Sequence, residues 1–364
     1  MSDSGLYQLL DVQGRLVEGA AAPALSDARL VEMYQWMLAT RTVDARLVNL
    51  QRQGRVAFYG SIMGQEAATI ASGMAAEACD WIFPALREGA LSVVRGLSME
   101  KAVAQFYGTA LDDCKGRQMP CHPSFVSGHY VSMSSVIGTQ IPQAVGAAMA
   151  AKMRRDPAVM LAYMGDGATS EPDFAAAMNF AAVYKAPVVL ICQNNQWAIS
   201  VPASKQSVSL TFAVKARAFG MEGVRVDGND ALAVYTATRR AVEKARRGEG
   251  PTFLELVTYR LLGHTTSDDP TRYRNEAEVE IWRQRDPLPR LRAFLTVRGL
   301  WSDESDAAFV EQLTAEVQRA VEVAEQTPPP SADSMFDDVY STLPPHLREQ
   351  RAELEAFLRS TQHG

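Results

Sequence analysis

Hydrophobic and polar positions follow two different periods along the chain. Residues 26–53 repeat apolar side chains at the three-to-four-residue spacing of a helix, and Ser26 is a suitable N-cap. From about residue 130 onward, short apolar runs alternate with helical segments. The expected strands cover residues 158–164, 186–193, 223–228 and 252–261, and the expected helices cover 141–153, 173–185, a segment ending at Gly220 and a segment through Arg247.

This alternation predicts an α/β fold. Short apolar strands separated by helices favour a parallel sheet with helices on both faces. After the last strand, a polar segment leads into charged helical sequence from Glu276 to about Gln326, and one last helix follows a proline-rich link. We therefore expect three parts: an N-terminal arm and helix (1–54), an α/β domain (55–275) and a helical C-terminal extension that contacts partner subunits (276–364).

Composition narrows the classes of function. The 364 residues are 47% hydrophobic and 21% charged, and the net charge of −6 comes without a basic stripe, so we expect no nucleic-acid partner. No signal or transit peptide is recognisable, and no apolar run reaches the roughly 18 residues of a membrane span, so we expect no membrane partner. Four cysteines without a CxxC pair indicate reduced thiols and a cytoplasmic protein, and Cys121-His122 lacks the second ligand pair of a zinc site.

Gly165-Asp166-Gly167 follows the strand at 158–164, just before a predicted helix. Asp-Gly is a common turn dipeptide, so the tripeptide alone favours a turn. The alternative is a metal or phosphate site, because ligands of open parallel sheets lie beyond the carboxyl ends of the strands. Ser170 is placed to cap the following helix, and the amides of that helix start favour an anion.

A second polar pair, Asn194-Asn195, ends the next predicted strand. Two asparagines also suit a turn. One helix and one strand separate them from Asp166, so we expect both groups at the same edge of the sheet. A carboxylate, an amide oxygen and a nearby backbone carbonyl are ligands that suit Mg²⁺, which commonly takes its remaining ligands from phosphates. The two segments together therefore indicate a magnesium–diphosphate site.

These segments resemble the thiamine diphosphate fingerprint. The chain as a whole is similar to alpha subunits of thiamine diphosphate-dependent 2-oxo acid dehydrogenases, most of all the branched-chain (2-oxoisovalerate) type. The likeness covers nearly the full length and includes "YQLLDVQGRLVEG", "GQEA", "KGRQMP", "TQIPQAVGAA", "VRVDGND" and "TYRLLGHTTSDD". The resemblance implies a thiamine diphosphate-binding fold and the cofactors thiamine diphosphate and Mg²⁺.

The resemblance also implies roles for individual residues. Mg²⁺ is expected on Asp166, Asn195 and the main-chain oxygen of Trp197. Arg87 is expected to grip the diphosphate, although it also suits a surface arginine beside Glu88. The other residues expected along the cofactor are Leu86, Ser135, Ile137, Gly165, Gly167, Ala168, Ile199 and His264.

His264 is the expected catalytic residue, because its place in the motif faces the reacting thiazolium ring. The unperturbed pKa of histidine suits either proton movement or contact with the terminal phosphate, whereas a lone histidine after a strand is otherwise an ordinary loop residue. Phe58, His122 and Ser135 are expected to border the substrate. Residues 134–140 resemble a potassium-binding loop, which makes K⁺ a further candidate cofactor.

The chain departs from its relatives at several positions. Leu86 stands where relatives often have tyrosine, and Gln193 where the closest relatives can carry arginine. Losing these donors is expected to weaken phosphate binding. Trp197 replaces a tyrosine, Pro172 replaces a glycine, and Val136 departs from the potassium loop.

By resemblance, the reaction is oxidative decarboxylation of branched-chain 2-oxo acids such as 3-methyl-2-oxobutanoate, followed by acyl transfer to the lipoyl groups of an acyltransferase core. The expected assembly is an α₂β₂ heterotetramer whose beta subunit supplies a glutamate near the cofactor. Residues 263–275 are a candidate lid. Thr265 lies where animal relatives are phosphorylated, but Asn275 replaces another such site, so no kinase control is expected.

Alternative functions follow from the same features. Pyruvate or acetoin is the alternative substrate, because a pocket distinguishes one methylene by only about 1–3 kcal/mol. The loss of the two phosphate donors also suits a non-catalytic subunit with the same fold. A magnesium–nucleotide-binding protein is the third alternative, but the chain has no P-loop.

Overall fold

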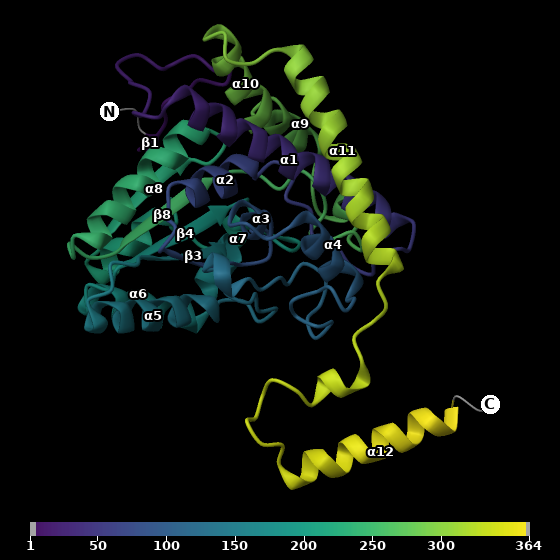
Figure 1. The fold of residues 1–364 in the computed structure, drawn as a ribbon. Helices are drawn as coiled ribbons and strands as arrows, with labels where there is room; N and C mark the ends of the chain where they lie inside the picture. The colour runs from purple at the N-terminus through teal and green to yellow at the C-terminus, as the bar shows by residue number, and fades with distance from the viewer. Residues whose placement is uncertain (1–4, 362–364) are drawn as a thin grey trace.

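The structure, a computed structural model in which residues 5–361 are described, is built around a six-stranded parallel sheet. The strand order is β1-β7-β8-β4-β3-β2 (Figure 1). The predicted α/β fold with a parallel sheet is therefore confirmed. The strands are β1 (Leu6–Tyr7), β2 (Trp81–Phe83), β3 (Met160–Gly165), β4 (Val188–Asn194), β7 (Glu222–Asp227) and β8 (Thr252–Val257), and a separate antiparallel hairpin joins β5 (Trp197–Ala198) to β6 (Val201–Pro202).

Helices cover both faces of this sheet because successive strand side chains point into two different cores. In β4, Val189 and Ile191 pack into one core, whereas Val188, Leu190 and Cys192 pack into the other. The two layers lie above and below the strands in Figure 1. The first layer contains α1 (Asp27–Arg52), α2 (Glu66–Met74), α8 (Ala231–Arg246) and α10 (Pro287–Val297), and the second contains α5 (Gln140–Arg154) and α6 (Pro172–Val183).

The helix boundaries confirm some sequence predictions and correct others. Ser26 caps α1 by accepting a hydrogen bond from the backbone N–H of Arg29. Ser170 does not cap α6: it belongs to a 3₁₀ turn, Asp166–Ser170, and α6 begins after Glu171 without a side-chain cap. The segment before Gly220 does end there, but it is a 3₁₀ helix, Ala213–Phe219, rather than an α-helix.

The C-terminal part is helical, as expected. Helix α11 packs along α1 and α4 and buries one apolar side, whereas α12 has no buried residue and stands apart from the rest of the molecule in Figure 1. The remaining helices are α3 (Ala90–Val94), α4 (Met99–Tyr107), α7 (Ala203–Gln206), α9 (Glu276–Arg283), α11 (Asp303–Gln326) and α12 (Pro345–Thr361).

The N-terminal arm and helix α10 of the C-terminal extension both pack on the α/β part. Strand β1 lies at the edge of the sheet beside β7. The buried Arg290 of α10 donates hydrogen bonds to the carbonyl oxygens of Leu10 and Asp11 and forms an ion pair with Asp227. The division into three domains remains a prediction.

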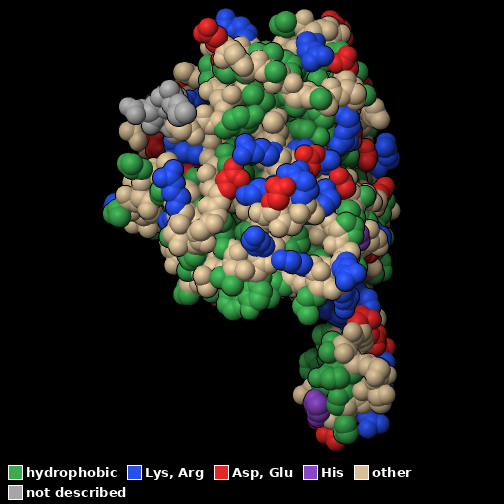
Figure 2. All heavy atoms as spheres, turned by 90° about the vertical axis from the view of Figure 1, so that its left-hand side faces the viewer, with side chains coloured by type: hydrophobic (Ala, Val, Ile, Leu, Met, Phe, Trp, Pro, Cys, Tyr) green, Lys and Arg blue, Asp and Glu red, His purple; other side chains and the backbone are tan. Residues whose placement is uncertain are grey.

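Helix α5 buries only one face in this chain. Its Met153 side chain is 85% exposed, and Phe180 and Val183 of the neighbouring α6 are also exposed. Figure 2 shows hydrophobic side chains along the lower edge of the body and interspersed Lys, Arg, Asp and Glu side chains across its middle. Between residues 5 and 361, no helix is long and apolar enough to cross a membrane.

Candidate active site

A cavity of about 510 Å³ lies at the carboxyl ends of β3 and β4, and we refer to it as the main cavity. This volume is typical of a small-molecule site. Every site residue expected from the sequence lines it, although these residues come from seven separate segments of the chain. They are Phe58, Leu86, Arg87, His122, Ser135, Ile137, Gly165, Asp166, Gly167, Ala168, Asn195, Trp197, Ile199 and His264.

The register of the sheet brings Asp166 to Asn195. Gly165 at the end of β3 pairs with Gln193 near the end of β4, so the residues that follow emerge together. Gly167 packs closely against this second segment, because an added Cβ would lie 2.7 Å from the Cβ of Ala198. Glycine is therefore needed here for close approach.

Asp166 has an unsatisfied carboxylate oxygen. Its Oδ2 accepts a hydrogen bond from Gln206 Nε2 at 3.0 Å, but the buried Oδ1 has no partner. Burial raises the pKa of Asp166 to about 6. An unpaired buried acceptor is costly, and a cation would satisfy it. This favours a ligand site over a simple turn.

Asn195 and Trp197 line the same cavity and carry oxygen atoms of the kind that Mg²⁺ prefers. Asn195 Nδ2 donates to Gln65 at 3.0 Å, Asn195 Oδ1 accepts from the Trp197 N–H at 3.2 Å, and the Trp197 carbonyl accepts from Arg260 at 3.3 Å, which leaves each of these two oxygens one lone pair for a further ligand. The loop is conformationally unusual, because Gln196 and Ile199 have φ values of +73° and +53°. Within residues 5–361 no group of three or more His, Cys, Asp and Glu side chains is placed to hold a metal.

Two buried arginines, Arg87 and Arg260, also line the main cavity. The buried Arg87 donates to the Ser61 carbonyl and, at 2.8 Å, to the His264 carbonyl. Burial and the neighbouring Arg260 lower the pKa of Arg87 to about 10, so it remains a cation at pH 7. Its burial excludes the alternative of a surface arginine, and a diphosphate would balance this charge.

His264 is neutral at pH 7. Burial, followed by the charges of Arg87 and Arg260, lowers its pKa to about 4, so the ordinary pKa expected from the sequence does not hold. Its Nδ1 lies 3.4 Å from Arg87 Nη2 and 3.5 Å from Arg260 Nη1. Since guanidinium nitrogens only donate, Nδ1 is the acceptor and Nε2 carries the proton. His264 therefore offers an N–H donor rather than a cation.

Two of the residues expected to border the substrate, His122 and Ser135, are hydrogen-bonded to each other. His122 Nδ1 lies 2.9 Å from the Pro120 carbonyl, so it donates, and Nε2 accepts from the Ser135 hydroxyl at 2.6 Å. His122 is buried, whereas Ser135 and Ile137 are exposed at the rim. Phe58 is half-buried on the same cavity.

Several residues of the main cavity were not predicted as site residues from the sequence, and Arg260 and Gln65 are two whose polar groups bear on the site. Arg260 donates to the carbonyls of Trp197 (3.3 Å) and Ile199 (2.6 Å), so one buried guanidinium links the hairpin to His264. Gln65 carries a buried Nε2 without a partner. Both lie in segments that the sequence had marked, "TYRLLGHTTSDD" and "GQEA", but their reach into the cavity depends on the fold.

The polar segment 263–275 folds over Arg260. Asp268 accepts a hydrogen bond from the His264 N–H at 2.7 Å and another from the Tyr273 hydroxyl, and Tyr273 accepts from Arg260 at 3.0 Å. These bonds hold the segment in place beside the cavity. Whether it acts as a lid remains a prediction.

Leu86 and Gln193, the two positions where this chain lacks a phosphate donor of its relatives, place an apolar side chain and a partly unsatisfied amide at the main cavity. Leu86 presents only carbon atoms to the main cavity. Gln193 Nε2 donates to Thr69 at 3.0 Å, while its Oε1 is buried without a partner. Neither side chain therefore replaces the tyrosine or arginine donor to phosphate that relatives can carry at these positions.

Comparisons with known proteins identify the family of the chain. Residues 34–333 match the family model described as "Dehydrogenase E1 component". The chain is 43% identical over 356 residues to the 2-oxoisovalerate dehydrogenase subunit alpha 2, mitochondrial, of Arabidopsis thaliana, covering 98% of this chain and 75% of that protein.

Two further relatives agree with this match. The 3-methyl-2-oxobutanoate dehydrogenase subunit alpha of Mycobacterium tuberculosis is 43% identical over 340 residues, which cover 93% of this chain and 89% of that protein. The human 2-oxoisovalerate dehydrogenase subunit alpha, mitochondrial, is 39% identical over 356 residues, which cover 98% and 80%. The family expected from the sequence is confirmed: the chain belongs to the dehydrogenase E1 component family.

Proposed function

We propose that this chain is the alpha subunit of a thiamine diphosphate-dependent dehydrogenase that oxidatively decarboxylates branched-chain 2-oxo acids, with 3-methyl-2-oxobutanoate as a substrate. The observation that carries the proposal is the unpartnered Oδ1 of Asp166, in one cavity with Asn195, Arg87 and His264. The names of the relatives support the substrate class.

The residues of the main cavity fit the cofactor and its metal. Asp166, Asn195 and the Trp197 carbonyl would hold Mg²⁺, and Arg87 would bind the diphosphate. When bound, thiamine diphosphate supplies a thiazolium carbanion and an electron sink for decarboxylation. His264, protonated at Nε2, would donate a hydrogen bond to oxygen atoms that gain negative charge near it.

The assembly is part of the proposal. An exposed apolar rim formed by Val136, Ile137 and Ile199 borders the main cavity, as expected for a surface that a beta subunit covers in an α₂β₂ heterotetramer. That subunit would supply the missing glutamate, and the acyl group would pass to an acyltransferase core. Residues 276–364 would contact partner subunits. A K⁺ ion at residues 134–140 and a cytoplasmic location, which four unpaired cysteines suit, complete the proposal.

Binding of the cofactor tests the site. The alpha chain co-purified with its beta partner would be titrated with thiamine diphosphate and Mg²⁺ in a calorimeter. We expect micromolar or tighter binding that needs the metal and weakens at least tenfold in Asp166→Asn, which keeps the shape but removes the charge. The control is Asp113→Asn, a change of the same chemistry in an exposed residue. Absence of binding would favour the non-catalytic subunit.

Turnover tests the substrate. Reduction of an artificial electron acceptor would be followed with 3-methyl-2-oxobutanoate and with pyruvate in parallel. We expect the branched acid to have the higher kcat/KM. A preference for pyruvate would retain the chemistry and overturn the substrate class.

A further inference from the structure

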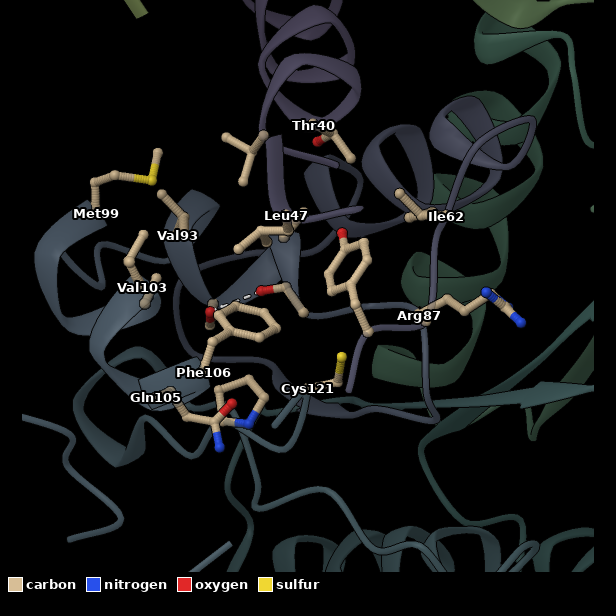
Figure 3. Close-up of a pocket in the computed structure, with 18 of the residues that line it drawn as sticks. Thr40, Leu47, Ile62, Arg87, Val93, Met99, Val103, Gln105, Phe106 and Cys121 are labelled. Carbon is tan, nitrogen blue, oxygen red and sulfur yellow. Dashed lines mark hydrogen bonds between the residues drawn. The ribbon is translucent and has the colours of Figure 1, made fainter. Parts of the chain in front are cut away.

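A second cavity of about 100 Å³ lies next to the main cavity, between α1, α3 and α4 (Figure 3). We refer to it as the apolar cavity. Figure 3 shows hydrophobic side chains around it, while the Arg87 guanidinium extends away from it. The side chains that enclose it include Leu47, Ile62, Val93, Met99, Val103 and Phe106.

No polar group in this lining needs a ligand. Thr40 donates to the Trp36 carbonyl, Tyr59 donates to Asp44, and Gln105 bonds to the Met119 carbonyl and the His122 N–H. Among the described residues, no unsatisfied buried side-chain atom lines this cavity. Apolar cavities of this kind stay dry and take apolar molecules, as an engineered cavity of ~150 Å³ takes benzene.

A thin wall separates the two cavities. Phe58, Glu88 and His122 line the main cavity, whereas their sequence neighbours Tyr59, Gly89 and Cys121 line the apolar cavity. The wall is therefore about one residue thick at three places.

Of the residues that the structure describes, only Leu86 and Arg87 border both cavities. Arg87 is fixed by hydrogen bonds to Ser61 and His264. Leu86 is half-buried and is held by van der Waals contacts alone, and its side chain lies against Gly60, where an added Cβ would come within 3.5 Å of Leu86 Cδ2. Leu86 is thus the part of the wall that can turn aside.

We propose that Leu86 is a specificity-determining residue: it is a movable wall through which the apolar cavity receives the end of a long or ring-bearing apolar side chain of a 2-oxo acid. The inference rests on the proposed function, and it adds a substrate class, 2-oxo acids with side chains longer than that of 3-methyl-2-oxobutanoate. Phe58 and His122, the expected substrate neighbours, lie at the same wall. The apolar lining excludes 2-oxo acids whose side chains end in a charge.

Chain length gives the first measurement. For the complex with the beta subunit, kcat/KM would be measured for 2-oxo acids with unbranched and phenyl-bearing side chains of increasing length. Each methylene buried in the apolar cavity is expected to raise kcat/KM by about fourfold until the cavity is full. A uniform fall with length from the shortest acid onward would overturn the proposal.

Two variants locate the effect. Val103→Phe fills the apolar cavity from α4, on the side opposite Arg87 in Figure 3, and is expected to lower kcat/KM for the longest acids at least tenfold relative to 3-methyl-2-oxobutanoate. Leu86→Ala removes the movable wall and is expected to raise the ratio of kcat/KM for the longest acids to kcat/KM for 3-methyl-2-oxobutanoate. Changes in cofactor affinity cancel in this ratio, because both substrates use the same holoenzyme. The matched control is Val183→Phe on the exposed face of α6, which should leave the ratio unchanged.

The outcomes separate the two proposals. If both cavity variants leave the ratio at its wild-type value while 3-methyl-2-oxobutanoate is turned over, the inference about Leu86 fails and the proposed function stands. If no 2-oxo acid is turned over by an intact complex, both fail. Should Val103→Phe not fold, Leu86→Ala alone decides.

Discussion

Glu88 is a single residue whose burial makes the stability of the chain depend on pH. Its side chain is 2% exposed, and Oε2 accepts a hydrogen bond from the Ala85 N–H at 2.7 Å. Burial raises its pKa from 4.5 to about 7. Between these values the folded state binds the proton more tightly than the unfolded state, so stability is lost as the pH rises through this window.

We predict that Glu88→Gln removes this loss. Glutamine retains an acceptor for the Ala85 N–H but never ionises. From pH 4.5 to 8, the free energy of unfolding of the variant should therefore rise by about 3 kcal/mol relative to wild type. Urea unfolding of the purified chain at stepped pH measures this, with the exposed Glu311→Gln as control. A constant difference between variant and wild type would show that Glu88 is ionised alike in both states.

At the residue scale, the sequence predicted which residues line the main cavity better than it predicted the chemical states of their side chains. Asp166 and Asn195 follow from strand ends and a known motif, because parallel strands place their carboxyl ends at one edge. The lowered pKa of His264 could not be predicted, since it depends on burial and on Arg87, which lies far away in the sequence. Gln65 and Arg260 were missed for the same reason.

At the element scale, Asp230 joins two segments through one carboxylate. Its Oδ1 caps α8 by accepting from the N–H groups of Leu232 and Ala233, and Oδ2 accepts from those of Leu9 and Leu10, at 2.6 Å each. This side chain therefore starts a central helix and also fixes the N-terminal arm beside the sheet.

We predict that Asp230→Ala destabilises the chain by about 3 kcal/mol or more, because it leaves several buried N–H groups without an acceptor. Ser26→Ala, which removes an ordinary cap from α1, should cost only about 1 kcal/mol. Chemical denaturation of both variants gives the comparison. Equal losses would mean that the bonds to Leu9 and Leu10 contribute nothing.

The elements themselves were predictable where the local pattern decides them. The central strands β3, β4, β7 and β8 are apolar runs long enough to recognise, and their predicted ranges overlap the observed ones. The edge strands β1 and β2 have only two and three residues and were not predicted. Their strand character comes from pairing with β7 and β3, which no local period reveals. Ser170 shows the opposite error: its residue type predicts a helix cap, but in the structure it is the last residue of the 3₁₀ turn that begins at Asp166.

At the scale of the whole molecule, the chain is a packed body with one helix left outside it. Helix α11 belongs to the body, because Leu313, Val317 and Val321 are buried beside α1 and α4. Helix α12 buries nothing, and its Phe357 side chain is 62% exposed (Figure 1). An isolated helix of this length is marginal in water, so α12 needs a surface to pack against.

We predict that a chain ending at Tyr340, without α12, unfolds at the same temperature as the full chain but associates more weakly with its partner subunits. The unfolding temperature should not change because no buried area is lost from the body, whereas the assembly loses the contact that orders α12. Calorimetry of the isolated chain and sedimentation of the complex measure the two effects. A chain ending at Leu300 is the control: it also lacks α11 and should lose folding, because the apolar sides of α1 and α4 become exposed. A fall in the unfolding temperature on removal of α12 alone would place that helix on its own chain instead of on a neighbour.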